Sequence, residues 1–318
     1  MKDPGPALRH KRIMKVLALL LCFVSSVVCA QSPKSKGKNA APAMTDAAVK
    51  HEERLYKTAP EGELKLHLAL PMDWQAADKR PAIVFFFGGG WKNGSYRQFV
   101  AQGDYFASRG MVAASADYRI ESIHHTTPDK CVEDAKSAVR YLRQHAAELG
   151  IDPDRIVAAG GSAGGHLAAC TALIDAFDAA TDDKSISAKP NAMVLFNPAL
   201  NLDEISVLRG ASAEKKAQAE AITPNRFLKA GAPPAILFFG TADSLKSGAD
   251  SYVAKAKSLG LRAELWTAAD QPHGFFNRAP WAQVTVQKAD QFLASLGYLK
   301  GEPTVKLPPS APLLILQP

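Results

Sequence analysis

The sequence predicts one large α/β domain, in which a mainly parallel sheet is covered by helices on both faces. The chain has 318 residues and 47% apolar content, enough to bury a sizeable core. Short apolar runs of strand length alternate with helical patterns along most of it. Runs such as 81–87 are continuously apolar, which is typical of strands that are buried on both faces of a sheet.

The first 52 residues lie outside this pattern. A basic segment that ends at Lys15 is followed by an apolar run over 16–28 and by small residues up to Ala30. This order is that of a secretory signal peptide over 1–30, with cleavage near Ala30 and export to the periplasm or the cell exterior. The run is short for a permanent membrane span, and Val28 before Cys29 disfavours a lipoprotein site. Residues 31–52 have the composition of a flexible linker.

The basic charge of the chain lies mostly in these first residues. The formal charge is +7, and it falls to +3 when residues 1–30, with five Lys or Arg and one Asp, are removed. Part of the remaining excess is Lys34, Lys36 and Lys38 of the linker, which have no aromatic residues between them. We therefore expect a solvated tether and no nucleic-acid partner. Met14 is a second possible start of the chain, and the oligomeric state stays open.

Two cysteines remain after signal cleavage, Cys131 and Cys170. Both fall on predicted helices among apolar neighbours, which favours buried free thiols over a disulfide and leaves pairing open. Without Cys-x-x-Cys spacing, neither a metal site nor another cofactor is expected.

The elements follow one another from residue 53. Leucines alternate with polar residues over 64–70, which predicts a half-exposed strand near a sheet edge. The central strand 81–87 ends in Gly88-Gly89-Gly90-Trp91, where the backbone can approach a ligand closely. The later elements are helix 97–109, strand 111–118, helix 129–149, strand 156–159 with a helix after Ser162, strands 192–196, 235–239 and 262–266, and helix 281–296.

Two segments are irregular. Residues 197–233 contain a short polar helix candidate at 212–221 and are expected to form a small flap over the site. The domain is expected to end near residue 300, and 301–318 read as a proline-rich, loosely packed tail.

The residues around Ser162 predict a catalytic nucleophile. An apolar strand stops at Gly160-Gly-Ser162-Ala-Gly164 and the chain resumes as a helix. Glycine is expected two residues before and after the serine because side chains there would collide across the turn. The turn pushes the hydroxyl out at the strand end, and the helix N-terminus favours an oxyanion beside it.

A hydrolytic serine also needs a base and an acid that orients the base. His273 follows one predicted strand and Asp243 follows the strand before it, so both should emerge at the same sheet edge as Ser162. Asp270 and Asp203 are alternative carboxylates. His166 is closest to Ser162 in sequence, but four residues into the helix it should point away from the hydroxyl.

Several motifs together resemble the α/β-hydrolase esterases, nearest the acetyl- and feruloyl-esterase-like enzymes related to the hormone-sensitive-lipase group. They are Phe87-Gly-Gly-Gly-Trp91, Asp117-Tyr-Arg119, Ile151-Asp-Pro-Asp-Arg-Ile156, Gly160 to His166, Gly240-Thr-Ala-Asp243 and His273-Gly-Phe275. The resemblance spans about residues 55–298. It implies Ser162 as nucleophile, His273 as base and Asp243 as acid, with the N–H groups of Gly89, Gly90 and Ala163 as oxyanion hole.

The sequence departs from this family at two places. Phe87 stands where the family commonly has histidine, so apolar packing must brace the glycine loop. Ser244-Leu245-Lys246 replaces the usual Val-Pro after the acid. The large N-terminal helical cap of many relatives has no counterpart in the polar residues 31–52.

We therefore expect an exported serine carboxylesterase with an open site. Its substrates would be small-molecule or carbohydrate esters with short acyl groups, such as acetyl groups on plant polysaccharide or glycosides. Trp91, Phe275 and Phe276 would line a shallow acyl pocket or, alternatively, pack in the core. A lipase, a peptidase or a non-catalytic binding protein on the same fold are the other interpretations.

Overall fold

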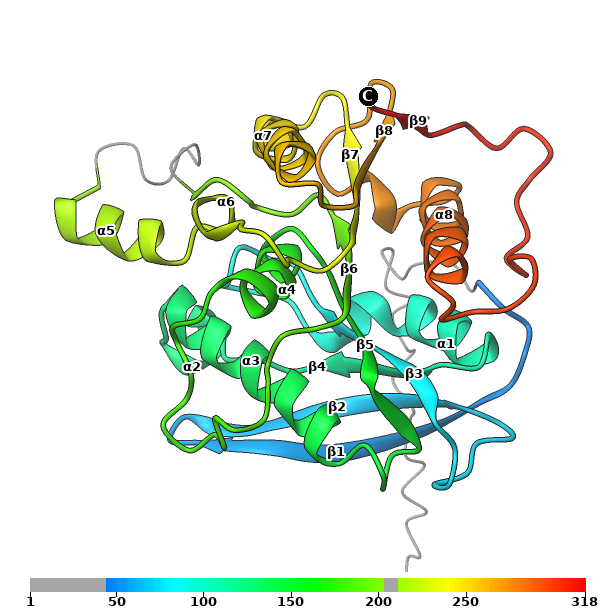
Figure 1. The fold of residues 1–318 in the computed structure, drawn as a ribbon, viewed down its shortest axis with the longest axis horizontal. Coiled ribbons are helices and arrows are strands. Elements are labelled where there is room, and N and C mark those ends of the chain that lie inside the picture. The colour runs from blue at the N-terminus through cyan, green and yellow to red at the C-terminus, as the bar shows by residue number, and fades with distance from the viewer. Residues whose placement is uncertain (1–43, 203–210) are drawn as a thin grey trace, which may run out of the picture. The chain divides into compact units, whose positions relative to one another are not determined.

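The computed structural model describes residues 44–202 and 211–318, which form an α/β domain (Figure 1). One sheet runs through it in the strand order β1-β2-β4-β3-β5-β6-β7-β8-β9. The strands are β1 (Val49–Ala59), β2 (Gly62–Pro71), β3 (Arg80–Phe86), β4 (Val112–Ala116), β5 (Ile151–Gly161), β6 (Ala192–Phe196), β7 (Ala235–Gly240), β8 (Ala263–Ala268) and β9 (Ile315–Leu316). From β4 to β8 all neighbours are parallel, which confirms the predicted fold class.

Helices cover both faces of this sheet (Figure 1). Helices α3, α4 and α7 pack on one face, and α1 and α8 pack on the other. The helices are η1 (Tyr96–Phe99), α1 (Val100–Ser108), α2 (Glu121–His124), α3 (Pro128–Gln144), α4 (Ala163–Leu173), α5 (Ala213–Ala221), α6 (Pro224–Phe227), α7 (Lys246–Ser258), η4 (Phe275–Asn277) and α8 (Trp281–Ser295). Within residues 44–202 and 211–318, no helix is both long and apolar enough to cross a membrane.

The middle strands are buried on both faces, as their unbroken apolar sequences require. Every residue of β6 and β7 is buried. Because these strands are parallel, their carboxyl ends meet at one edge of the sheet. The loops that follow β3, β5, β6, β7 and β8 therefore lie side by side along this edge, in that order.

Both ends of the domain differ from the prediction. Residues 49–52, expected in the linker, belong to β1, which pairs with β2 along its whole length. The pattern of β1 is charged because it is an edge strand with much of its surface exposed. The tail expected over 301–318 is held to the sheet near its end, since Ile315 and Leu316 pair with Thr267 and Trp266 as an antiparallel strand, although both side chains are exposed. The predicted signal peptide and residues 31–43 lie outside the described residues.

Candidate active site

The candidate nucleophile stands at the turn between β5 and α4. Ser162 has φ 55° and ψ −118°, a strained conformation for a non-glycine residue. A Cβ on Gly160 would lie 2.5 Å from the backbone of Gly164, and a Cβ on Gly164 would lie 1.9 Å from the carbonyl oxygen of Phe86. Only glycine fits at both places. The tight turn half-exposes the Ser162 side chain at the carboxyl edge of the sheet.

Three side chains meet at this edge in a hydrogen-bonded row. Ser162 Oγ lies 2.8 Å from Nε2 of His273, and Nδ1 of His273 lies 2.8 Å from Oδ2 of Asp243. The Asp243 side chain is fully buried, whereas that of His273 is 40% exposed. This geometry fits a nucleophile, a general base and an orienting carboxylate.

The carboxylate has two further donors. Nδ2 of Asn197, in the loop after β6, donates to Asp243 Oδ2 at 2.6 Å. The N–H of Leu245 donates to Oδ1 at 2.9 Å, so the loop without Val-Pro still holds the acid. Sequence reasoning missed Asn197, although its place after a buried strand was a usable signal. Asp270 is exposed, and Asp203 lies outside the described residues.

The glycine loop after β3 packs against the turn between β5 and α4 that holds Ser162. A Cβ on Gly88 would lie 3.3 Å from the Cβ of Ser162. Gly89 and Gly90 have φ of 125° and 64°, and a side chain on Gly89 would strike the carbonyl of Asn93. Among the described residues, no backbone carbonyl accepts from the N–H groups of Gly89, Gly90 or Ala163. These groups are therefore available as oxyanion donors.

Apolar packing braces this loop, as the substitution of Phe87 for histidine led us to expect. The Phe87 ring stacks on Tyr118 with centroids 4.0 Å apart. The Tyr118 hydroxyl donates to the Phe87 carbonyl at 2.7 Å, which anchors the loop where it leaves β3.

His166 lies away from the Ser162 hydroxyl and has a different environment. It is fully buried; its Nε2 lies 2.7 Å from the carbonyl oxygen of Ile222, and its Nδ1 accepts from Trp91 Nε1 at 3.2 Å. Burial lowers its pKa to about 4, so the ring is neutral near pH 7. His166 ties the glycine loop to the segment around Ile222.

Comparison with known proteins adds the decisive observation. Residues 66–257 match the model of the BD-FAE family, which is more than half of the chain. The chain belongs to the BD-FAE family. Two relatives are the probable isoprenylcysteine α-carbonyl methylesterase ICMEL1 of Arabidopsis thaliana, 29% identical over 66% of this chain, and the carboxylesterase NlhH of Mycobacterium tuberculosis, 28% identical over 69%. The matched parts cover about half of the plant protein (48%) and 74% of the mycobacterial one.

Solved esterase structures share the fold of this BD-FAE member. Two structures of Thermogutta terrifontis esterase 2, one phosphorylated by paraoxon and one with butyrate bound, are 45% and 44% identical to it. Both have a TM-score of 0.72 and cover 79% of this chain and 96% of theirs. The family and these matches identify the described domain as a carboxylic ester hydrolase of the α/β-hydrolase fold, related to the hormone-sensitive-lipase group.

An apolar cavity of about 490 Å³ opens beside the glycine loop of this BD-FAE domain. Its lining includes Trp91, Leu202, Ala219 and Ile222, with charged side chains of Lys92, Glu121, Asp129 and Lys215. The buried hydroxyl oxygen of Thr126, another lining residue, has no hydrogen-bond partner among the described residues. Helix α5, part of the segment predicted to form a flap, contributes Lys215, Gln218 and Ala219 to its wall, whereas Ser162, Asp243 and His273 do not line it.

Two predicted lining residues are in the core instead. Phe275 and Phe276 are 3% and 1% exposed and pack on the α8 face of the sheet. The Phe276 ring packs against the rings of Phe196 and Phe99 in the core. Of the two predicted alternatives, Phe275 and Phe276 therefore take the core position rather than the pocket position. Closeness to His273 in sequence does not fix the direction of a side chain. Trp91 does line a cavity.

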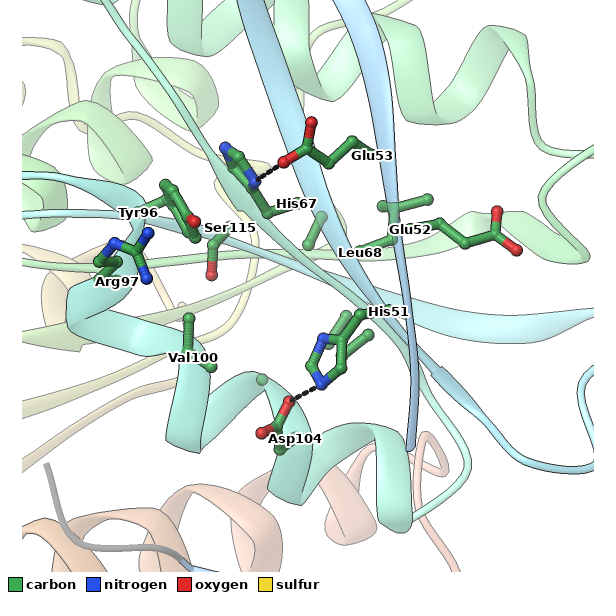
Figure 2. Close-up of a pocket in the computed structure, with 14 residues that line it drawn as sticks. His51, Glu52, Glu53, His67, Leu68, Tyr96, Arg97, Val100, Asp104 and Ser115 are labelled. Carbon is green, nitrogen blue, oxygen red and sulfur yellow. Dashed lines mark ion pairs between the residues drawn. The ribbon is translucent and has the colours of Figure 1, made fainter. Parts of the chain in front are cut away.

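A second cavity of about 360 Å³, lined by both charged and apolar residues, lies over β2 and β4, and none of Ser162, His273 and Asp243 lines it. Figure 2 shows His51 facing Asp104, with an N–O distance of 3.5 Å, and His67 facing Glu53 at 3.3 Å. In the part of the chain that the structure describes, no group of three or more His, Cys, Asp or Glu side chains is arranged to hold a metal ion.

Proposed function

We propose that the chain is a serine carboxylesterase that hydrolyses short-chain acyl esters through an acyl-enzyme. The observation that carries this proposal is the row from Ser162 Oγ to His273 Nε2 and from His273 Nδ1 to Asp243 Oδ2, with 2.8 Å for each step. In this row a neutral imidazole can accept the serine proton while its other nitrogen donates to a buried carboxylate.

The reaction then proceeds in two halves. Ser162 Oγ attacks the ester carbonyl and His273 takes its proton. The N–H groups of Gly89, Gly90 and Ala163 donate to the oxyanion that forms. As the tetrahedral species collapses, His273 gives the proton to the leaving alcohol, and the acyl group stays on Ser162. In the second half a water molecule attacks the acyl carbonyl while His273 takes its proton. The bond between the acyl carbon and Ser162 Oγ then breaks, His273 returns the proton to Oγ, and the acid is released.

The substrate proposal is a short acyl group on a larger alcohol. Short carboxylic acids bind to a solved relative, since Thermogutta terrifontis esterase 2 is described with butyrate bound and with propionate bound. The cavity of about 490 Å³ is large enough for a drug-sized group, and its apolar wall suits the carbon skeleton of an alcohol. Acetylated plant polysaccharide and glycosides carry such a short acyl group on a larger alcohol.

One assay tests this function. The purified chain is offered nitrophenyl esters of about two to twelve carbons beside acetylated xylan, and Ser162→Ala is the control. We expect turnover of the short esters by the wild type only. Hydrolysis that persists in Ser162→Ala, or activity limited to long chains, would reject the proposal. We also infer export from residues 1–30, which have the order of a signal peptide.

A further inference from the structure

Gln98 lies in η1, a short helix that is fixed on both sides. The ring of Tyr96 stacks on His67 of β2 with centroids 3.4 Å apart, and Figure 2 shows the two side by side at the cavity over β2 and β4. Phe99 is fully buried and stacks on Phe85 and Phe276. The backbone of Gln98 is therefore held firmly against the sheet.

The Gln98 amide joins two loops that are far apart in sequence. Its Oε1 accepts from the N–H of Gly88 at 2.6 Å. Its Nε2 donates to Oδ1 of Asn277 at 3.0 Å, and Nδ2 of Asn277 donates to the carbonyl oxygen of Gly274 at 3.1 Å. Gly274 directly follows His273. Three hydrogen bonds thus connect the glycine loop to the histidine loop.

The place of these bonds gives them a role in catalysis. Gly88 precedes the proposed oxyanion donors Gly89 and Gly90, and it packs against Ser162. Gly88 lies beyond the last residue of β3, so no β-ladder hydrogen bond fixes it. An error of about 1 Å in the placement of reacting groups can cost about 100-fold in rate. The bridge therefore joins the loop of the proposed oxyanion donors to the loop of the proposed base.

We propose that Gln98, acting through Asn277, is a positioning residue that holds the oxyanion loop and the His273 loop in register. The proposal rests on the proposed esterase function. Gln98 is suited to it because an amide supplies an acceptor and a donor in one group. Neither Gln98 nor Asn277 is among the residues that line the apolar cavity, so the effect should fall on turnover rather than on substrate binding.

A double-mutant cycle tests the bridge. Its variants are Gln98→Met, Asn277→Ala and the double variant. Gln98→Met keeps the length of the side chain and removes both of its polar groups. We expect each single variant to lose about tenfold in kcat while KM stays within about twofold. The double variant should lose no more than Gln98→Met alone, because residues that act as a unit are non-additive. Gln144→Met, the same substitution at the exposed end of α3, is the matched control and should keep wild-type kinetics.

Three outcomes would overturn the proposal. They are a kcat of Gln98→Met within twofold of the wild type, multiplicative losses in the double variant, or a loss that appears in KM alone. If Gln98→Met does not fold, Asn277→Ala, at a half-buried position, decides by the same kcat and KM criteria. If the wild type itself shows no turnover that depends on Ser162, the esterase function fails, which is a distinct result.

Discussion

His166 makes the stability of this protein depend on pH in a way that can be calculated. The ring is fully buried, and its Nδ1 accepts from Trp91, so its single proton must be on Nε2, facing the Ile222 carbonyl. A second proton on Nδ1 would face the Trp91 N–H, donor against donor. Burial accordingly lowers the pKa from 6.5 to about 4.

Protonation of His166 favours the unfolded chain, so acid should lower the free energy of unfolding. Between pH 6.5 and pH 4 the unfolded chain binds a proton at His166 that the folded chain does not. The free energy of unfolding therefore falls as the pH falls through this window, by up to about 1.4 kcal/mol per pH unit and ~3 kcal/mol in total. This stabilisation is fully present above pH 6.5 and is lost by pH 4.

The assay is urea unfolding of the wild type and of His166→Gln, which can keep one acceptor and one donor. From pH 8 to pH 5 the stability of the wild type should fall by about 2 kcal/mol more than that of the variant. A difference between wild type and His166→Gln that stays constant over this range would refute the neutral, buried histidine.

The other predictions concern the reaction and the chain. Asp243→Ala should lower kcat by about 10³-fold or more, because the imidazole loses its orienting partner, whereas Asp270→Ala and Asp203→Ala should stay within a few fold; the reverse ranking would move the acid. kcat/KM should peak at acyl chains of two to four carbons, since each buried CH₂ is worth ~0.8 kcal/mol only where a deep acyl tunnel exists. A maximum at eight carbons or more would contradict the short-acyl proposal. Exported protein should begin at Gln31 by N-terminal sequencing, and uncleaved protein retained in the cytoplasm would contradict export.

Local turn chemistry and strand order made much of the site predictable from sequence. The glycines around Ser162 follow from steric limits within five residues, which a sequence displays directly. The proximity of Asp243 and His273 follows from the rule that parallel strands end at one sheet edge. The structure confirms the fold class, and it brings these three side chains within hydrogen-bonding distance.

The rest depends on tertiary contacts that leave no local pattern. The edge strand β1 is charged, and β9 has only two residues among prolines, so neither shows an apolar period. The bond from Asn197 to Asp243 and the bridge from Gln98 to Asn277 join residues 46 and 179 positions apart. Phe276 follows His273 closely, yet the turn at Gly274 directs it into the core.

Covalent labelling of Ser162 tests the central claim most directly. The purified chain is incubated with paraoxon, and intact mass and peptide mapping then locate the adduct. We predict one diethylphosphoryl group per chain, on the peptide that contains Ser162, with parallel loss of esterase activity and no label on Ser162→Ala. The expected loss of turnover in that variant is about 10⁴-fold or more. An adduct on another residue, or a Ser162→Ala variant that keeps a tenth of the activity, would contradict the assignment of Ser162 as the nucleophile.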